Sequence, residues 1–332
     1  MPRPRPPRRV HAAALAAALL LPACGAPAAG PDAASGPGGA DAACPPPPDL
    51  ARPPERVVTM DGGAAAILRE LGLADRVVGT AAPDFFAAFP AEDRADLERI
   101  PVIDDGTGNR EAVIAAEPDL VMGISTYEFG AFDGTPTRAE LADAGIAALV
   151  ACDDGGPENG IDDTLAFVRQ TADVFGVPER GADLADRLEK ELAEAAAPAE
   201  GADPVRVLAA SVAPAAGQGV STLGAPSTTH GIITAAGGEN IAGDIDQRMA
   251  EISTEEVVRR DPQVILVLTG FSPATGAEIT DALRAAPSLA ATSAVRDDRF
   301  VVLPQSIATS PSVLNPQAVA RLAAALHGGA DR

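Results

Sequence analysis

The chain has 332 residues, 46% of them hydrophobic, so it is long enough for two domains with substantial cores. Its formal net charge at pH 7 is −22, which makes binding to nucleic acid or to an acidic membrane surface unfavourable. The composition therefore excludes polyanion-binding classes but names no partner.

The first residues have the features of an export signal. Four arginines without an acidic residue precede a short apolar run, which is too short to span a bilayer, and LPAC follows at 21–24. A small residue before Cys24 resembles a bacterial lipobox, in which the cysteine is acylated; the alternative is an ordinary signal peptide with an incidental cysteine. We expect a lipoprotein signal peptide over 1–23, a flexible Gly-, Ala- and Pro-rich tether over 24–53, and extracytoplasmic anchoring to the cell membrane.

Two further cysteines lie at the end of the tether and in the predicted first domain. Cys44 and Cys152 form an even pair for an oxidising compartment, where a disulfide is expected to join the tether to that domain. The alternative is two free thiols.

A folded body begins near Pro54, and its strands and helices alternate. Apolar runs typical of buried parallel strands are followed by helical patterns that break at glycine. The pattern predicts strands over 56–60, 206–211 and 299–304, a helix over 279–290 and a helix–strand pair over 138–151. In the segments 64–79 and 229–243 it predicts helices that break at Gly72 and Gly237 before another short strand. Such alternation indicates α/β lobes with mainly parallel sheets over 54–160 and 201–330. A helical linker over 161–200 contains one long helix, near 179–198, that joins the lobes.

The chain also contains one sequence pattern twice, called here the repeated phrase: EAVIAAEPDLVMGI from Glu111 and EEVVRRDPQVILVL from Glu255. Asn109 and Ser253 are good N-cap residues two positions before each glutamate, and Ser253 with Glu256 fits a capping box. A proline seven residues after each glutamate ends the helix, and an apolar strand follows. Each phrase therefore predicts a short helix that leads into a buried strand.

These features together resemble the class III substrate-binding proteins of ABC importers, which serve iron-siderophores, cobalamin and haem. The matching phrases include PERVVTMDGGAAAILRELGLADRVVG, IPVIDD, GTPTRAELADAGI, AAGGENI, AVRDDRFVVLP and NPQAVARLAAALH, and they span about residues 54 to 327. The resemblance implies two lobes joined by one long helix and a monomer without a resident cofactor. The implied partners are an ABC permease dimer with its ATPase.

The resemblance gives the repeated glutamates a role. In this family one glutamate on each lobe docks into arginine pockets of the permease, and these glutamates match Glu111 and Glu255. Exposed carboxylates on pseudo-symmetric lobes suit a two-fold symmetric partner. The alternative is that each carboxylate merely complements the N-terminus of its helix.

The ligand is expected between the lobes, at loops that follow strand ends. The sequence departs from its relatives there, with Met249 where they often have tryptophan and Leu314 where they often have arginine. Phe86 and Phe129 are further candidates for apolar walls of this site, although each aromatic side chain has core packing as its alternative. The candidate ligand-binding residues are Met60, Asp61, Asp84, Phe85, Tyr127, Thr229, His230, Arg248, Met249 and Phe271.

The expected ligand is a small-molecule chelate, in the first instance a ferric siderophore. The alternatives are cobalamin, haem, a deazaflavin coenzyme precursor, or a ligand-sensing lipoprotein without transport. Direct binding of a bare metal ion is not expected, because the chain after residue 23 retains two histidines, His230 and His327. The chain carries no G-x-S-x-G elbow, P-loop or dinucleotide fingerprint, so an enzyme is not expected.

Overall fold

The computed structural model describes residues 46–151, 160–215 and 217–328, all within one compact unit. The predicted signal peptide, most of the tether, and Cys24, Cys44 and Cys152 lie outside the described residues.

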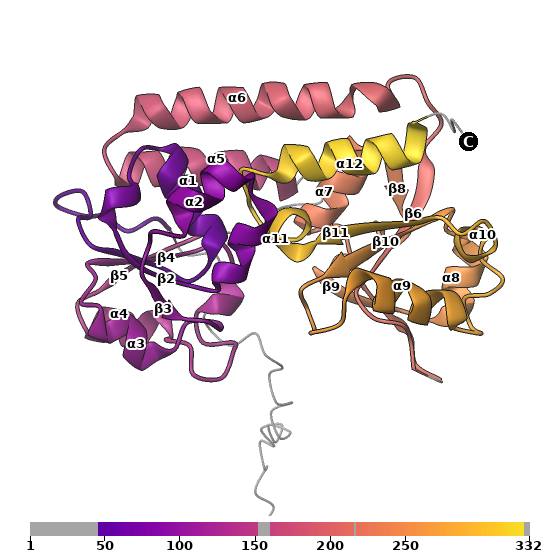
Figure 1. The fold of residues 1–332 in the computed structure, drawn as a ribbon, viewed down its shortest axis with the longest axis horizontal. Coiled ribbons are helices and arrows are strands. Elements are labelled where there is room, and N and C mark those ends of the chain that lie inside the picture. The colour runs from indigo at the N-terminus through magenta and orange to yellow at the C-terminus, as the bar shows by residue number, and fades with distance from the viewer. Residues whose placement is uncertain (1–45, 152–159, 216, 329–332) are drawn as a thin grey trace, which may run out of the picture. The chain divides into compact units, whose positions relative to one another are not determined.

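The first lobe is built on a parallel sheet with the strand order β3-β2-β1-β4-β5 (Figure 1). Its strands are β1 (Val57–Thr59), β2 (Val77–Ala81), β3 (Val102–Asp104), β4 (Leu120–Gly123) and β5 (Ala147–Val150). Its helices are α1 (Gly62–Glu70), α2 (Ala91–Leu97), α3 (Arg110–Ala115) and α4 (Arg138–Asp143), with 3₁₀ turns η2 (Ala74–Arg76), η3 (Pro83–Ala88) and η4 (Thr126–Glu128).

The second lobe repeats this plan with a parallel sheet in the order β11-β10-β6-β8. Its strands are β6 (Val205–Ala210), β8 (Gly238–Asn240), β10 (Val264–Thr269) and β11 (Phe300–Pro304), and an antiparallel ribbon joins β7 (Val220–Leu223) to β9 (Met249–Ile252). Its helices are α7 (Thr228–Ala235), α8 (Thr254–Arg260), α9 (Gly276–Ala285), α10 (Ser293–Arg296), α11 (Gln305–Ala308) and α12 (Asn315–His327). The predicted α/β architecture with parallel sheets is confirmed.

Both faces of each sheet are covered, which explains the continuously apolar strands. In β1, Val57 packs into a cluster with α1, α5 and α6, whereas Val58 packs into a cluster with α3 and α4. In β6, Val207 faces α7 and α12, whereas Leu208 faces α8 and α9. The alternation of side chains along a strand thus serves two cores per lobe.

Two helices connect the lobes, α5 (Gly160–Val174) and α6 (Pro178–Ala196), before a short 3₁₀ turn η5 (Ala197–Ala199). Buried Leu184 and Leu188 lie on one face of α6 and join the core of the first lobe. At its other end α6 lies beside α12, so this helix extends over both sheets (Figure 1). The long helix predicted over 179–198 is therefore present.

The repeated phrase folds in the same way in both lobes. The side chain of Asn109 accepts hydrogen bonds from the first amides of α3, and that of Ser253 accepts one from Glu256 in α8. The predicted capping box is wrong in one respect, because the Glu256 carboxylate binds Arg259 and Arg260 instead of the N-cap amide. Oppositely charged guanidinium groups hold this carboxylate more strongly than a neutral amide would.

An arginine at the start of the first strand of each lobe, Arg56 just before β1 and Arg206 within β6, holds the end of the repeated helix. Arg56 Nε donates to Glu117 O (2.8 Å), and Arg206 Nε donates to Asp261 O (2.9 Å). Glu117 and Asp261 both have positive φ, at 48° and 44°, and each directly precedes the proline. The arginine satisfies carbonyls that the helix end leaves without intrahelical partners.

A second connection between the lobes follows α11. Val313 lies in the core of the first lobe, and Leu314 packs against the cores of both lobes. The buried amide of Asn315 donates to Ile307 O (3.0 Å) and Ser310 O (3.2 Å), and its Oδ1 accepts from Thr164 of α5 (2.9 Å). Residues 310–315, called here the return segment, are thus fixed to both lobes.

Candidate functional site

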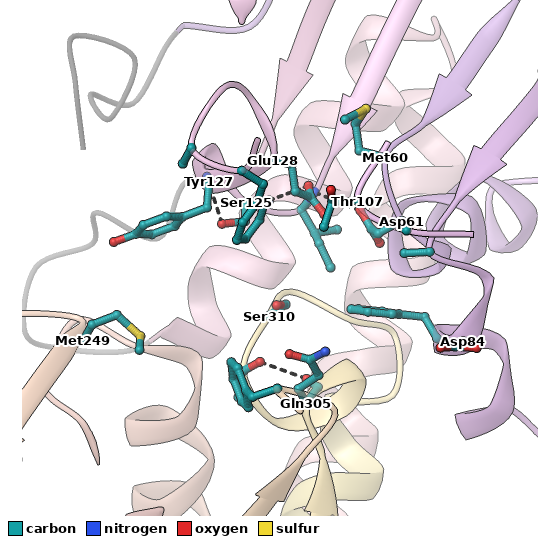
Figure 2. A pocket seen from close by; sticks show the side chains of 18 of the residues that line it. Met60, Asp61, Asp84, Thr107, Ser125, Tyr127, Glu128, Met249, Gln305 and Ser310 are labelled. Carbon is teal, nitrogen blue, oxygen red and sulfur yellow. Dashed lines mark hydrogen bonds between the residues drawn. The ribbon is translucent and has the colours of Figure 1, made fainter. Parts of the chain in front are cut away.

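A cavity of about 720 Å³ lies between the lobes. The first lobe contributes the ends of β1 and β4, the turns η3 and η4 and the loop at 105–107; the second contributes the end of β7, the start of β9, Phe271 and residues 305–310 (Figure 2). Its size falls in the ordinary range for small-molecule sites, and its position at strand ends is typical of α/β folds.

Most of the candidate residues line this cavity. Thr229 and His230 do not, because they belong to α7 on the far side of β7. The cavity also includes residues that the sequence did not single out, at 105–107, 131–132 and 309–310. The candidates that line it are Met60, Asp61, Asp84, Phe85, Tyr127, Arg248, Met249 and Phe271.

The aromatic candidates divide between cavity and core. Phe85 lines the cavity, but its neighbour Phe86 is 3% exposed and lies in the core beneath. Phe129 is likewise buried, in the second core of the first lobe. A Cβ on Gly62 would approach Phe85 Cβ to 2.7 Å, so the glycines after Asp61 allow η3 to pack closely on α1.

Asp61 organises the first-lobe wall of the cavity. Its side chain is the N-cap of α1, where Oδ1 accepts from Gly63 N (2.5 Å) and Ala64 N (2.9 Å). Its second oxygen accepts from Ile124 N (3.3 Å), which ties the start of α1 to the end of β4. One buried carboxyl thus positions the loop that carries Tyr127.

Glu128 faces Asp61, and the two form what we call the carboxyl pair. Burial raises the pKa of Asp61 to about 6, although backbone amides and the hydrogen bond with Glu128 work against the rise. Burial and the nearby Asp61 charge raise the pKa of Glu128 well above its ordinary value. The hydrogen bond between the two carboxyls lowers the pKa of Asp61 and raises that of Glu128, so it favours the shared proton on Glu128, whose Oε2 also accepts from Ser125 N (3.2 Å).

The rim of the cavity is apolar and exposed. Met249 is 54% exposed, Phe271 47% and Phe132 44%, and all three line the cavity. Large apolar side chains left open to water at a cavity mark a surface that a ligand covers. The site is therefore suited to a ligand with a large apolar face.

One arginine reaches across the cavity from the second lobe. The Arg248 guanidinium lies 5.7 Å from the centre of the Tyr127 ring, and its Nη2 donates to Thr309 O (2.9 Å). Figure 2 shows Tyr127 and Met249 on opposite walls at the same side of the cavity. Cation–π contact between the lobes thus closes one side of the site.

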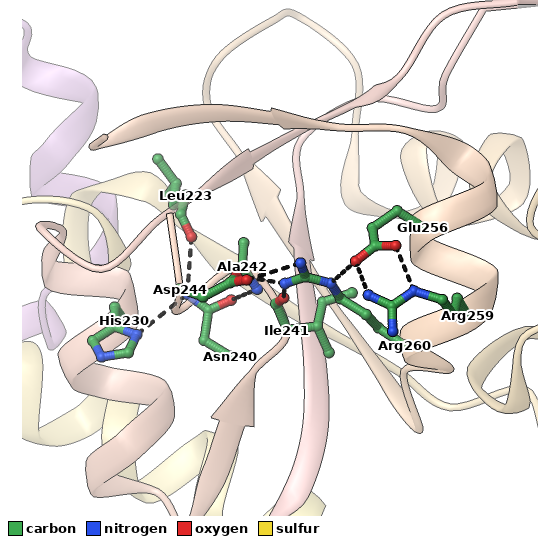
Figure 3. Close-up of polar contacts among 9 residues, drawn as sticks. All are labelled: Leu223, His230, Asn240, Ile241, Ala242, Asp244, Glu256, Arg259 and Arg260. Atoms are coloured by element: carbon green, nitrogen blue, oxygen red, sulfur yellow. Dashed lines mark hydrogen bonds and ion pairs between the residues drawn. The ribbon is translucent and has the colours of Figure 1, made fainter. Parts of the chain in front are cut away.

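His230 has a supporting position behind the β7–β9 ribbon (Figure 3). Its Nδ1 lies 3.4 Å from Asn240 Nδ2, which also donates to Leu223 O (2.9 Å), and burial lowers the pKa of His230. The buried Thr229 hydroxyl donates to Ala308 O (2.6 Å). The prediction that a helix starts near His230 is correct, since α7 begins at Thr228. The side chains of Thr229 and His230 contact other residues of the protein and do not line the cavity.

One sequence pattern could have identified the cavity loop at 105–107. In DDGTGN at 104–109, the Asp104 carboxylate accepts from the amides of Gly106, Gly108 and Asn109. Such an aspartate–glycine turn orders Thr107 against the cavity. The contribution of Thr309 and Ser310 had no comparable local signal, because the return segment places them.

Glu111 and Glu255 occupy matching positions in the first turns of α3 and α8, and both are exposed. Their neighbours differ. Beside Glu111, Arg110 forms an ion pair with Glu140. Beside Glu255, the Glu256 carboxylate binds Arg259 and Arg260, and Arg260 also binds Asp244 (Figure 3).

No helix among residues 46–151, 160–215 and 217–328 is both long and apolar enough to cross a membrane. Within the same residues, no group of three or more His, Cys, Asp or Glu side chains could hold a metal ion.

Comparison with known proteins identifies the family. The family model described as periplasmic binding protein matches residues 57–307. A cobalamin-binding protein of Halobacterium salinarum is 30% identical over 285 residues, covering 82% of this chain and 70% of that protein.

Solved structures agree with this match. An ABC-type Fe³⁺-hydroxamate transport system protein of Saccharomonospora viridis aligns with a TM-score of 0.68 and 28% identity, covering 83% of this chain and 94% of that one. The periplasmic heme-binding protein RhuT of Roseiflexus sp. RS-1 aligns with a TM-score of 0.66 and 27% identity, covering 82% and 98%. Two parallel-sheet lobes, a cavity between them and these matches together place the chain in the periplasmic binding protein family.

Proposed function

We propose that the chain is the substrate-binding lipoprotein of an ABC importer, and that it captures a large metal chelate of low charge in the cavity between its lobes. The observation that carries this proposal is the exposed apolar rim formed by Phe132, Met249 and Phe271. Burying such a rim stabilises a complex with a broad apolar ligand, at roughly 25 cal/mol per Å² of apolar surface.

Charge narrows the ligand class. Apart from Glu128, which the carboxyl pair favours in its protonated form, the acidic and basic side chains on the cavity are Asp61, Asp84, Asp105 and Arg248. Three carboxylates against one guanidinium disfavour a trianionic ferric catecholate. A corrinoid is the first candidate, since the Halobacterium salinarum relative is named cobalamin-binding. A ferric hydroxamate siderophore is the second, since the Saccharomonospora viridis protein belongs to such a system.

Delivery to the permease is proposed to use Glu111 and Glu255. Both carboxylates are exposed on matching helices of the two lobes, which suits two equivalent basic pockets on a symmetric partner. Acylation of Cys24 would keep the protein at the membrane that holds this permease.

Thermal unfolding of the chain from residue 25 onward tests the ligand class. The panel comprises cyanocobalamin, ferrioxamine B, a ferric catecholate, haem and deazaflavin precursors. A ligand at a hundred times its dissociation constant adds about 2.7 kcal/mol to the free energy of unfolding. We expect a shift with the corrinoid or the hydroxamate and a smaller one with the catecholate.

A matched variant ties the shift to the cavity. Tyr127→Ala removes the ring that faces Arg248 and should reduce the shift, whereas Phe300→Ala, whose ring lies against Arg284 outside the cavity, should not. A shift with the catecholate alone would overturn the charge argument, and a panel without any shift would contradict the proposed ligand class.

A further inference from the structure

A small side chamber adjoins the main cavity within the second lobe. Its volume is about 20 Å³, and it shares Leu223, Met249 and Phe271 with the main cavity. The remaining wall comes from the ends of β6 and β10 and from β7: Ala209, Ala210, Ser211, Ser221, Thr222 and Leu268. Carboxyl ends of parallel strands are where α/β proteins commonly bind ligands.

Thr222 distinguishes this chamber from an ordinary packing gap. Its side chain is 4% exposed, and among the described residues its hydroxyl has no hydrogen-bond partner. Three other buried threonine hydroxyls share that state, at Thr171, Thr228 and Thr280, but of the four only Thr222 lines the side chamber. Because leaving a buried hydroxyl unpaired is unfavourable, a partner supplied from the cavity accounts for it.

The frame of the chamber is fixed, whereas its entrance can move. Thr222 pairs with Ala250 and Leu223 with Met249 in the β7–β9 ribbon, and Asn240 Nδ2 holds Leu223 O from behind (Figure 3). Met249 is more than half exposed and has an unbranched side chain with three rotatable bonds. A rotation of Met249 therefore enlarges the entrance without disturbing the ribbon.

The lining decides which chemical group fits. It contains small, hydroxyl and apolar side chains and no ionisable one. A carboxylate placed there would be buried without a counter-ion, which is strongly unfavourable. A carboxamide is neutral, and its carbonyl can accept from the Thr222 hydroxyl while its amino group donates.

We propose that this side chamber is a subsite for a carboxamide side arm of the ligand, which displaces Met249 and hydrogen-bonds the Thr222 hydroxyl. The proposal rests on the function proposed above and narrows it toward ligands with neutral amide arms, such as the corrinoids, and away from ligands whose arms are carboxylates. As it stands the chamber has room for about one water molecule, so the arm enters when Met249 moves.

Two variants and two probes test the subsite. Calorimetric titration with cyanocobalamin should show Thr222→Val binding about 3- to 10-fold more weakly, because a hydrogen bond is lost without a change of shape. Thr222→Ser keeps the hydroxyl and should bind within about twofold of the unmodified protein. Monocarboxylate derivatives of the same corrinoid should bind at least tenfold more weakly for one arm, and Thr222→Val should keep that discrimination, because the penalty comes from burying a charge in a neutral lining.

The melting temperature of the ligand-free protein provides an independent test. Because the hydroxyl has no partner among the described residues, Thr222→Val should leave the melting temperature of the ligand-free protein unchanged or higher. A clearly lower melting temperature, or cyanocobalamin affinity unchanged by Thr222→Val, overturns the subsite. If the unmodified protein ignores cyanocobalamin, the corrinoid assignment fails, and the melting comparison still decides whether the hydroxyl is free.

Discussion

The two lobes share a backbone plan but differ where they face the ligand. Arg56 and Arg206 hold the ends of α3 and α8 in the same way, and Glu111 and Glu255 stand in matching first turns. In the cavity, the first lobe presents a wall fixed by the buried carboxyls of Asp61 and Glu128, whereas the second presents Arg248 and the exposed apolar side chains of Met249 and Phe271. The helices away from the ligand thus kept their common form, and the strand ends diverged.

The largest effect is expected from breaking the part that the lobes share. Replacing both Glu111 and Glu255 by Ala should abolish uptake in cells, because each lobe loses its proposed docking carboxylate. Affinity for the ligand should not change, since neither residue lines the cavity. Uptake assays and titration of the purified variant measure the two quantities.

The matched control replaces one exposed glutamate in each lobe away from these helices. Glu92→Ala with Glu239→Ala removes the same charge and should leave uptake intact. The single variants Glu111→Ala and Glu255→Ala sharpen the comparison, because equivalent docking predicts similar losses. Full uptake by the double variant contradicts the docking proposal.

The next effect concerns the N-caps of the first helix in each lobe. Asp61 accepts from three backbone amides, whereas the corresponding Ser227 accepts from His230 N (3.1 Å) and donates to Gly224 O (2.7 Å). Asp61→Ala should lower the free energy of unfolding by about 2–3 kcal/mol, and Ser227→Ala by about 1–2 kcal/mol. Urea unfolding at pH 6 measures both, with Asp61→Asn as the variant that retains an acceptor. Equal losses would show that the two caps are equivalent after all.

The smallest effect is a pH dependence whose sign differs between the lobes. The raised pKa values of Asp61 and Glu128 mean that folding favours their protonated forms, so their contribution is complete at acid pH and is lost as the pH rises through about 6. Glu128→Gln should reduce this loss by on the order of 1 kcal/mol between pH 5 and pH 8. The measurement is urea unfolding of both proteins across that range.

His230 gives the opposite sign in the second lobe. Burial lowers the pKa of His230, so its contribution is complete above its ordinary pKa near 6.5 and is lost as the pH falls below it. His230→Gln should therefore flatten the acid side and leave the alkaline side unchanged. If Glu128→Gln loses as much unfolding free energy as the unmodified protein when the pH rises from 5 to 8, the carboxyl pair is not the source of that loss.

Local patterns were sufficient to predict the repeated units. Asn109 and Ser253 start their helices as the cap rule requires, and the residues before Pro118 and Pro262 leave the helical region. Glu256 was predicted less well, because its partners Arg259 and Arg260 compete with the cap amide. Charge competition between neighbours is not visible in a capping motif.

The cavity was harder to predict because single positions decide it. Phe85 and Phe86 are adjacent in η3, yet one lines the cavity and the other fills the core. Thr229 and His230 follow a strand end as binding residues do, but the antiparallel β7–β9 ribbon separates them from the cavity. The residues paired in that ribbon are 26 to 32 positions apart in the sequence, and no local periodicity predicts such a pairing.

The return segment has a consequence for how occupancy is communicated. Leu314 is partly buried and packs against the cores of both lobes at once, and Asn315 ties the segment to α5, so a wide rotation of one lobe would break these contacts. Empty and loaded forms are therefore expected to have nearly the same lobe angle. If the proposed function holds, the permease would then distinguish the two forms by contact with the rim, where the proposed ligand would cover Phe132, Met249 and Phe271, and not by the distance between Glu111 and Glu255.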